Sequence, residues 1–152
     1  LAKGLASGYP ISAVLFREEL GSWPPGAHGT TFGGQAVAAA AAHATLDLLE
    51  GGLQENAARL GEFLLAELRA LKRRFPFLGD VRGRGLMIGL DFGDPDHPQP
   101  DLRDKAVRLA FEKGLLLLPA GPSALRIAPP LVLTQEEAAL GLEILEEVFR
   151  AL

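Results

Sequence analysis

Lys3 is the residue near the start of the chain whose side chain could carry out covalent chemistry. It lies among apolar residues and glycines in the stretch Leu-Ala-Lys-Gly-Leu-Ala-Ser-Gly-Tyr-Pro at positions 1–10. A lysine in dry surroundings can lose its proton, and its amine can then form a Schiff base with an aldehyde. The neighbouring glycines would let a bulky ring approach that amine. The other interpretation is an ordinary surface lysine after a strand, because lysines are rarely buried.

A loop rich in glycine and hydroxyl groups follows, with the sequence His-Gly-Thr-Thr-Phe-Gly-Gly at positions 28–34. Thr30 and Thr31 precede a long alanine-rich segment, so their hydroxyls and the first N–H groups of a helix could hold a phosphate. The loop could instead be a simple helix cap, because a Gly/Thr loop is a weak motif. Pyridoxal 5'-phosphate carries both an aldehyde and a phosphate, so it would suit the lysine and the loop together.

The remaining candidate residue is Arg126. It is a lone cation in the apolar stretch at positions 124–130. A buried guanidinium without a partner is costly, so a structural ion pair or an edge-strand charge is one interpretation. The functional interpretation is a bidentate clamp for a substrate carboxylate, which the guanidinium fork suits. Arg82 and Arg84, which flank Gly83, are expected to face solvent or an interface.

The bulk composition is that of a globular chain and excludes several classes of partner. Of 152 residues, 48% are hydrophobic and 22% are charged, which suits one ordinary folded domain. The net charge of -4 argues against binding to nucleic acid or to an anionic membrane surface. There are no cysteines and three scattered histidines, so we expect neither disulfides nor a metal centre. No apolar stretch is long enough for a transmembrane helix, and a cytoplasmic protein is the default expectation.

The first part of the chain is expected to contain short strands and then helices. Residues 1–3 could close a strand, and the part-apolar, β-branched stretch 11–16 predicts another. The alanine-rich stretch 35–49 predicts a helix, which Gly51 and Gly52 end or kink. Leucines recur at three or four residues over 53–74, which predicts an amphipathic helix.

The second part is expected to form an α+β unit. Residues 81–92 predict a strand pair or a bulged strand, whose glycines allow close approach. Asp101 is expected to cap a helix that ends at Lys113. Residues 115–118 and 124–128 predict two further short strands. Thr-Gln-Glu-Glu at 134–137 is a capping box that opens a last helix to Leu152.

Taken together, four stretches resemble the class III, or ω-amino-acid, aminotransferases, in the family's order and at its approximate spacings. This family includes 4-aminobutyrate, acetylornithine and ornithine aminotransferases. One departure is Gln35-Ala36, where the family usually has Asn-Pro, and this change removes no catalytic group. The matching stretches are positions 1–10, 28–36, 81–90 and 125–131.

The resemblance implies an α/β fold, that of the fold-type I pyridoxal-phosphate-dependent transferases. The chain would contain the C-terminal part of the large domain and a small α+β C-terminal domain. Residues 1–50 would end the large cofactor domain, with the Schiff-base lysine and the phosphate loop. Residues 51–75 would form a connecting helix, and residues 76–152 the small domain.

The resemblance also implies a role for each candidate residue. Lys3 becomes the Schiff-base lysine, which would also shuttle a proton between the substrate Cα and the cofactor. Thr31, with Thr30 beside it, becomes a phosphate ligand that is donated to the active site of the neighbouring subunit. Arg126 becomes the carboxylate-binding arginine. The working enzyme would therefore be at least a homodimer with shared active sites.

The implied reaction is transamination of an ω-amino acid with 2-oxoglutarate as amino acceptor. The segment at 115–121 favours 4-aminobutyrate as the amino-acid donor, with an acetylornithine- or ornithine-type enzyme as the alternative. Because the chain begins at Leu1, we interpret it as the C-terminal part of a longer enzyme. The family's glycine-rich phosphate loop, its ring-stacking aromatic residue and its pyridine-pairing aspartate would then precede it, and the fragment alone is expected to be inactive. A hypothesis of another class is a non-catalytic fragment with a structural or interaction role.

Overall fold

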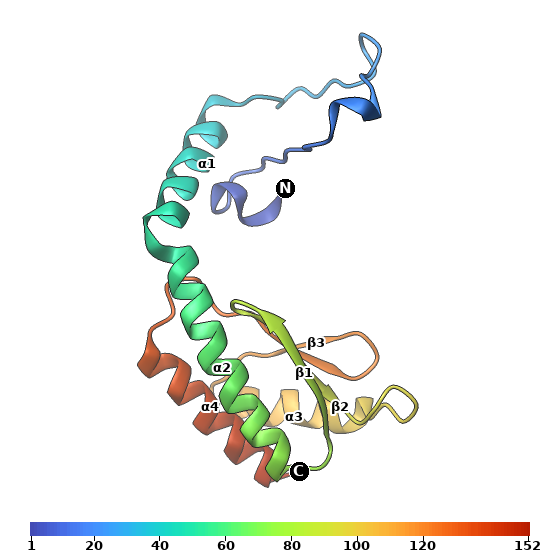
Figure 1. Ribbon diagram of the computed structural model, residues 1–152, viewed down its shortest axis with the longest axis vertical. Helices are drawn as coiled ribbons and strands as arrows, with labels where there is room; N and C mark the ends of the chain where they lie inside the picture. Colours follow the sequence, from blue (N-terminus) through green and yellow to red (C-terminus); the bar gives the residue numbers. More distant parts are fainter. The chain divides into compact units, whose positions relative to one another are not determined.

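The structure is a computed structural model that describes all of residues 1–152, and the chain divides into two compact units (Figure 1). Residues 1–52 form the first unit and residues 53–152 the second. The predicted division into a large-domain end, a connecting helix and a small domain stays a prediction about the whole protein.

The first unit is mostly irregular chain, and the strands predicted at 1–3 and 11–16 are wrong for this structure. A 3-10 turn covers Lys3–Ala6, and residues 11–16 belong to no sheet. Leu1 and Ala13 exchange backbone hydrogen bonds, in which the Leu1 amine donates to the Ala13 carbonyl at 2.7 Å and the Ala13 N–H donates back at 2.9 Å. A strand needs a ladder of such bonds with a neighbour, and this unit provides one pair only.

Helix α1 covers Ala36–Leu48 and confirms the helix predicted from the alanine-rich stretch. Its buried residues are Ala38 and Ala42, whose small side chains let other backbone pack closely. The hydroxyls of Ser7 and Thr45 lie 3.0 Å apart and join the end of the 3-10 turn to α1. A π-helical turn over Leu49–Leu53 follows, with Gly52 at a φ of 127°, which explains the need for glycine there.

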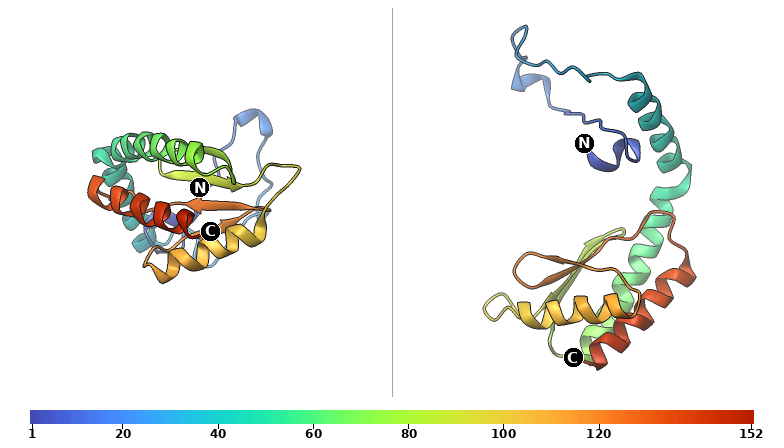
Figure 2. Two further views of the ribbon diagram at one scale, coloured as in Figure 1. Left: turned by 90° about the horizontal axis from the view of Figure 1, so that it is seen from below. Right: turned by 180° about the vertical axis from the view of Figure 1, so that it is seen from behind.

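The second unit is a four-stranded antiparallel sheet with three helices (Figure 2). The strand order is β1-β2-β4-β3. The strand pair predicted over 81–92 is confirmed, whereas the strand predicted at 115–118 begins only at its last residue. The elements are α2 (Gln54–Arg74), β1 (Leu78–Arg84), β2 (Met87–Phe92), α3 (Pro100–Glu112), β3 (Leu118–Ala120), β4 (Ala124–Ile127) and α4 (Gln135–Arg150).

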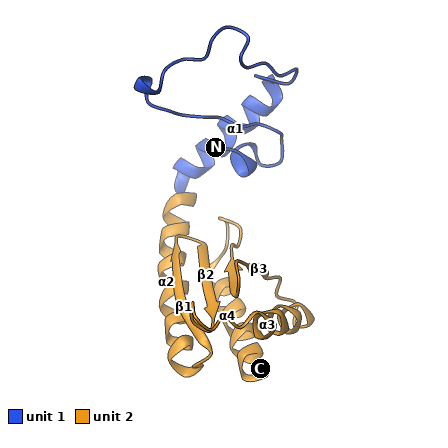
Figure 3. Cartoon of the chain, turned by 90° about the vertical axis from the view of Figure 1, so that its right-hand side faces the viewer, with its two compact units in different colours: residues 1–52 blue, residues 53–152 orange.

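One face of this sheet is buried and the other is open. Alternate residues along β2 and β4 enter a single hydrophobic core with apolar residues of α2, α3 and α4, and β1 adds Leu78 and Val81 on either side of an irregularity in its pairing. In Figure 3 the strands of the sheet lie in front, and α4 lies behind the sheet. Burial of each large apolar side chain contributes about 1.5–3 kcal/mol, so the alternation fixes which face turns inward. The fully buried strand residues are Ile88, Leu90, Phe92 and Leu125.

Nearby residues explain where α3 and α4 begin, and one prediction about these helix starts is wrong. Thr134 forms the predicted capping box, because its hydroxyl accepts from the Glu137 N–H at 3.2 Å and its own N–H donates to the Glu137 carboxylate at 2.9 Å. Asp101 is not the cap of α3, because that helix begins one residue earlier at Pro100. Proline suits the first helical position, since its missing N–H would be unpaired there anyway. No helix in the chain combines the length and the apolar composition needed to cross a bilayer.

Helix α2 packs directly on the turn between β1 and β2. Gly61 of α2 is buried, and a Cβ at this position would overlap the backbone of Gly85. Gly85 itself has a φ of 53°, which favours glycine in the turn. The contact between Gly61 and Gly85 holds α2 against the β1–β2 hairpin, and β1 forms one edge of the sheet.

Candidate functional site

Lys3 lies in a backbone conformation that non-glycine residues rarely adopt. Its φ is 56°, and Ser7 at the end of the same turn has a φ of 47°. The left-handed conformation costs a non-glycine residue about 1–2 kcal/mol, and such residues cluster at functional sites. The Lys3 side chain is exposed and takes part in no hydrogen bond or ion pair, so the dry surroundings expected from the sequence are not present around it in this chain. No atom lies within 4 Å of where a Cβ would stand on Gly4, so the side of the turn next to the lysine is open.

The threonine loop is a glycine-dependent turn. The Gly33 N–H donates to the Thr30 carbonyl at 3.1 Å. A Cβ on Gly33 would stand 2.8 Å from the Thr30 methyl group, and Gly34 has a φ of 69°. The backbone conformation of Gly34 therefore favours glycine, and a side chain at Gly33 would displace the Thr30 methyl group. Thr30 and Thr31 are exposed, so their hydroxyls are open to a ligand.

The start of α1 borders a hollow in the first unit with a volume of about 430 Å³. The N-cap residue Gln35 makes no side-chain hydrogen bond to the helix. The first N–H groups of a helix have no partner within it, and they carry a partial positive charge. The arrangement suits an anion such as a phosphate. Lys3 and Thr31 are not among the lining residues, which are Pro10, Ile11, Ser12, Thr30, Phe32, Gly33, Gly34, Gln35 and Ala38.

Arg126 belongs to the second unit, on the open face of the sheet. It lies opposite Gly89 of β2 and opposite Leu118 of β3. Its side chain is exposed and makes no hydrogen bond or ion pair. The acidic partner considered from the sequence is therefore not needed, because the guanidinium is not buried. All five of its N–H donors are available to a ligand.

Arg82 shares this open face and, unlike Arg126, is held by acids. Its Nη2 donates to Asp91 Oδ1 at 3.0 Å, its Nη1 donates to the other oxygen of Asp91, and a longer contact of 3.3 Å reaches Asp80. The hydrogen bonds to Asp91 are the main cause that raises the pKa of Arg82 above its ordinary value. The sequence predicts only that Arg82 faces solvent or an interface, and does not predict its pairing with Asp91. The pair depends on the register of the β1–β2 hairpin, which brings Arg82 within reach of Asp91.

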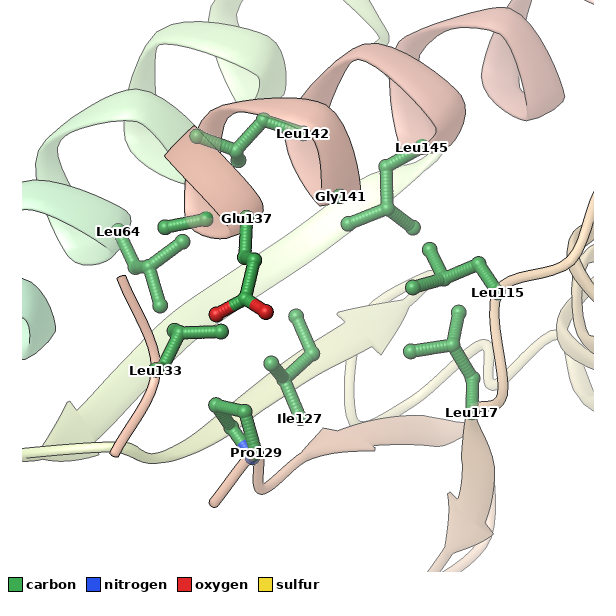
Figure 4. Close-up of a pocket in the computed structure, with 11 residues that line it drawn as sticks. Leu64, Leu115, Leu117, Ile127, Pro129, Leu133, Glu137, Gly141, Leu142 and Leu145 are labelled. Atoms are coloured by element: carbon green, nitrogen blue, oxygen red, sulfur yellow. The ribbon is translucent and has the colours of Figure 1, made fainter. Parts of the chain in front are cut away.

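A second hollow lies in the core side of the second unit, between α4 and the sheet (Figure 4). It is small, at about 90 Å³, and almost entirely apolar. The one carboxylate in it belongs to Glu137, which is already engaged in the capping box of α4. We assign this hollow to packing rather than chemistry. Its lining residues are Leu64, Leu115, Leu117, Ile127, Pro129, Leu133, Glu137, Ala138, Gly141, Leu142 and Leu145.

The chain is similar to known proteins over almost its whole length. A model of the family described as aminotransferase class-III matches residues 1–149. An alanine/serine racemase from Pyrococcus horikoshii is 41% identical over 97% of this chain and 32% of its own length. An acetylornithine aminotransferase from Bacillus subtilis is 42% identical over 91% of this chain and 34% of its own length.

A solved structure shows the same likeness in three dimensions. The crystal structure of acetylornithine aminotransferase from Elizabethkingia anophelis superposes with a TM-score of 0.86 and 33% sequence identity. The match covers 99% of this chain and 40% of that one. The chain spans about a third of the length of the curated relatives that it matches.

Proposed function

This chain belongs to the class III aminotransferase family, and from that premise we propose that its protein is a pyridoxal-phosphate-dependent aminotransferase for an acetylornithine-type amino acid. The predicted family and the predicted fold-type I class are confirmed. The observation that carries the proposal is the family match over residues 1–149, because it includes Lys3, the threonine loop and Arg126.

The residues of the first unit fit the cofactor on two counts. Lys3 offers an unpaired amine beside an open glycine, which suits the aldehyde. Thr30, Thr31 and the uncapped start of α1 offer hydroxyl and N–H donors, which suit the phosphate. When bound, pyridoxal 5'-phosphate supplies an electron sink for the bond that breaks at the substrate Cα.

Lys3 has two tasks in this proposal. Its Nζ holds the cofactor through the aldehyde carbon, and, once released, the same amine moves a proton at the substrate Cα. Both tasks need a neutral amine that can change its position. The exposed Lys3 side chain supports them, because no hydrogen bond or ion pair holds it in the turn.

The threonine loop holds the phosphate end. Thr31 is the proposed ligand, with Thr30 and the first N–H groups of α1 beside it. We propose that this loop serves the active site of a neighbouring subunit in a homodimer. Lys3 and Thr31 of one chain would then belong to two different sites.

Arg126 is the proposed clamp for a substrate carboxylate. Its exposure on an open sheet face and its lack of any acidic partner support this role. A planar guanidinium can donate two parallel hydrogen bonds to one carboxylate, which fixes orientation as well as charge. The same clamp would serve the carboxylates of the amino donor and of 2-oxoglutarate, the proposed acceptor, in turn.

The names of the relatives favour acetylornithine over 4-aminobutyrate as the donor. The Bacillus subtilis relative and the Elizabethkingia anophelis structure are both acetylornithine aminotransferases. The segment at 115–121 favours 4-aminobutyrate, with an acetylornithine- or ornithine-type enzyme as the alternative, and the relatives support that alternative.

A racemase is the second candidate function, and the Pyrococcus horikoshii relative is the observation that favours it. Racemisation at Cα would use the same lysine to remove and return a proton, but it would need no amino acceptor. Product analysis therefore separates the two functions.

The test uses the full-length protein loaded with pyridoxal 5'-phosphate. It is incubated with 2-oxoglutarate and either N-acetylornithine or 4-aminobutyrate, and glutamate formation is followed. We expect kcat/KM for N-acetylornithine to exceed kcat/KM for 4-aminobutyrate by about tenfold or more. A difference of this size is typical of one good binding contact. In parallel, L-alanine and L-serine are incubated without an acceptor and analysed by chiral chromatography. Racemised amino acid in the absence of glutamate formation would exclude the aminotransferase and support the second candidate.

A further inference from the structure

The open face of the sheet places two arginines in one row across three strands. Arg82 of β1 lies opposite Gly89 of β2, and Gly89 lies opposite Arg126 of β4. Residues that are directly opposite on neighbouring strands project their side chains from the same face. Both guanidiniums therefore belong to the open face, and the residue between them has no side chain.

The Arg82 side chain covers part of the space above that glycine. A Cβ at Gly89 would stand 3.7 Å from Cζ of Arg82. The guanidinium keeps this position because both oxygens of Asp91 accept from it and Asp80 lies at 3.3 Å. Arg82 is thus turned along the sheet toward Asp91, with about half of its side chain still exposed (55%).

Asp91 is the acid that could otherwise pair with Arg126. It lies opposite Ala124, two residues before Arg126, so it is a diagonal neighbour of Arg126 on the same face. Diagonal neighbours are about 7–8 Å apart, which is within reach of an arginine side chain. The strands β2, β3 and β4 contain no other acidic residue.

We propose that Arg82 is a positioning residue that holds Asp91 and so keeps Arg126 unpaired and available for a substrate carboxylate. This inference rests on the proposed role of Arg126. Without Arg82, Asp91 would be a lone carboxylate beside an unpaired guanidinium, and the two would pair. That internal ion pair would compete with the substrate carboxylate for the same N–H donors and weaken its binding by about fivefold, the upper range for a partly exposed pair.

The test measures carboxylate binding directly, so that it does not depend on turnover. Glutarate, a dicarboxylate with no keto group, is titrated by calorimetry into the full-length, cofactor-loaded protein. We expect Arg82→Gln to raise the Kd for glutarate about fivefold. The double variant Arg82→Gln/Asp91→Asn removes the competing acid, and its Kd is expected to return to within about twofold of the parent value. The KM for 2-oxoglutarate should follow the same order, with kcat changed less than KM.

Recovery in the double variant separates positioning from simple structural damage. A structural role predicts that removing Asp91 as well leaves binding weak or weakens it further, and that result would overturn the inference. An unchanged Kd in Arg82→Gln would overturn it too. If Arg82→Gln does not fold, Arg82→Lys replaces it, because lysine keeps one charged contact to Asp91 and should give a smaller increase in Kd.

Two further variants make the outcomes distinguishable. Arg74→Gln removes another exposed, bidentate arginine pair of the same unit, with Glu146, and is expected to leave the glutarate Kd unchanged. An equal loss in Arg74→Gln and Arg82→Gln would contradict positioning. Arg126→Gln tests the proposed function itself. If its Kd does not rise, both the clamp and the inference fail, whereas a rise there with none in Arg82→Gln refutes the inference alone.

Discussion

Arg126 of β4 lies directly opposite Gly89 of β2, so the residue that faces it on the neighbouring strand has no side chain to cover its guanidinium. A larger residue at that position would stand beside the arginine on the open face of the sheet. The glycine leaves a cation whose donors are all available, next to an Arg82–Asp91 pair whose charges are matched. The predictions for carboxylate binding at Arg126 depend on this arrangement.

Replacement of the proposed clamp should affect binding more than turnover. Hydrogen bonds to a charged group contribute about 1.5–3 kcal/mol, so Arg126→Gln is expected to raise the KM for 2-oxoglutarate by about 10- to 100-fold. Steady-state kinetics on the full-length protein measure this. Arg69→Gln, the same change at an exposed position of α2, is the matched control and should leave KM unchanged. An unchanged KM in Arg126→Gln would remove the carboxylate role from this residue.

Loss of the threonine hydroxyl should weaken cofactor binding. Thr31→Val keeps the shape of the side chain and removes one donor to a charged phosphate, so the Kd for pyridoxal 5'-phosphate should rise about tenfold or more. Fluorescence titration of the cofactor-free protein gives this Kd. Thr134→Val is the control, because it removes the cap of α4 and should lower stability by about 1 kcal/mol without changing cofactor affinity. Equal cofactor Kd values for Thr31→Val and the parent would contradict the phosphate role.

Replacement of two helical glycines by alanine should change the thermal stability of the protein in opposite directions. In Gly61→Ala the new methyl group meets the Gly85 backbone, and overpacking of this kind costs about 1–3 kcal/mol. In Gly141→Ala of α4 the methyl group meets only Leu115 at 3.9 Å, and alanine favours a helix by about 0.5–1 kcal/mol over glycine. Thermal unfolding should therefore show a lower Tm for the first variant and an equal or higher Tm for the second. A Gly61→Ala protein with the parent Tm would mean that α2 does not pack on this turn.

Acid should remove the contribution of the Arg74–Glu146 pair to stability. The hydrogen bond from Arg74 is the main cause that holds the pKa of Glu146 below its ordinary value of 4.5. A depressed carboxylate pKa stabilises the folded state above the unfolded-state pKa, and this contribution is lost as the pH falls through the folded-state value. Arg74→Gln should therefore lose less stability than the parent between pH 7 and pH 3, as measured by urea unfolding. An identical acid loss in both proteins would show that the pair contributes nothing, and added salt should reduce the difference.

Local signals in the sequence were sufficient for much of the second unit. The leucine spacing predicted α2, and the Thr134 capping box predicted the start of α4, because both depend on residues within one or two turns. The exposure of Arg126 was also readable, since Leu125 and Ile127 alternate with it along the strand.

Long-range pairing explains what could not be predicted. Residues 11–16 have strand-like composition, yet a strand forms only beside another strand, and the first unit supplies a single pair of bonds between Leu1 and Ala13. The Arg82–Asp91 pair depends on the exact register of the hairpin, which one residue of slip would change. The left-handed backbone of Lys3 has no sequence signature, since lysine does not favour that conformation.

Chemical trapping of the cofactor on the full-length protein tests the central claim most directly. The protein is loaded with pyridoxal 5'-phosphate, reduced with borohydride and digested, and the modified peptide is identified by mass spectrometry. Reduction makes the bond between a lysine amine and the cofactor permanent, so the label marks the residue that holds it. The account predicts the label on Lys3, and its loss from that peptide in Lys3→Ala. A label on any other lysine of the parent protein would contradict the account.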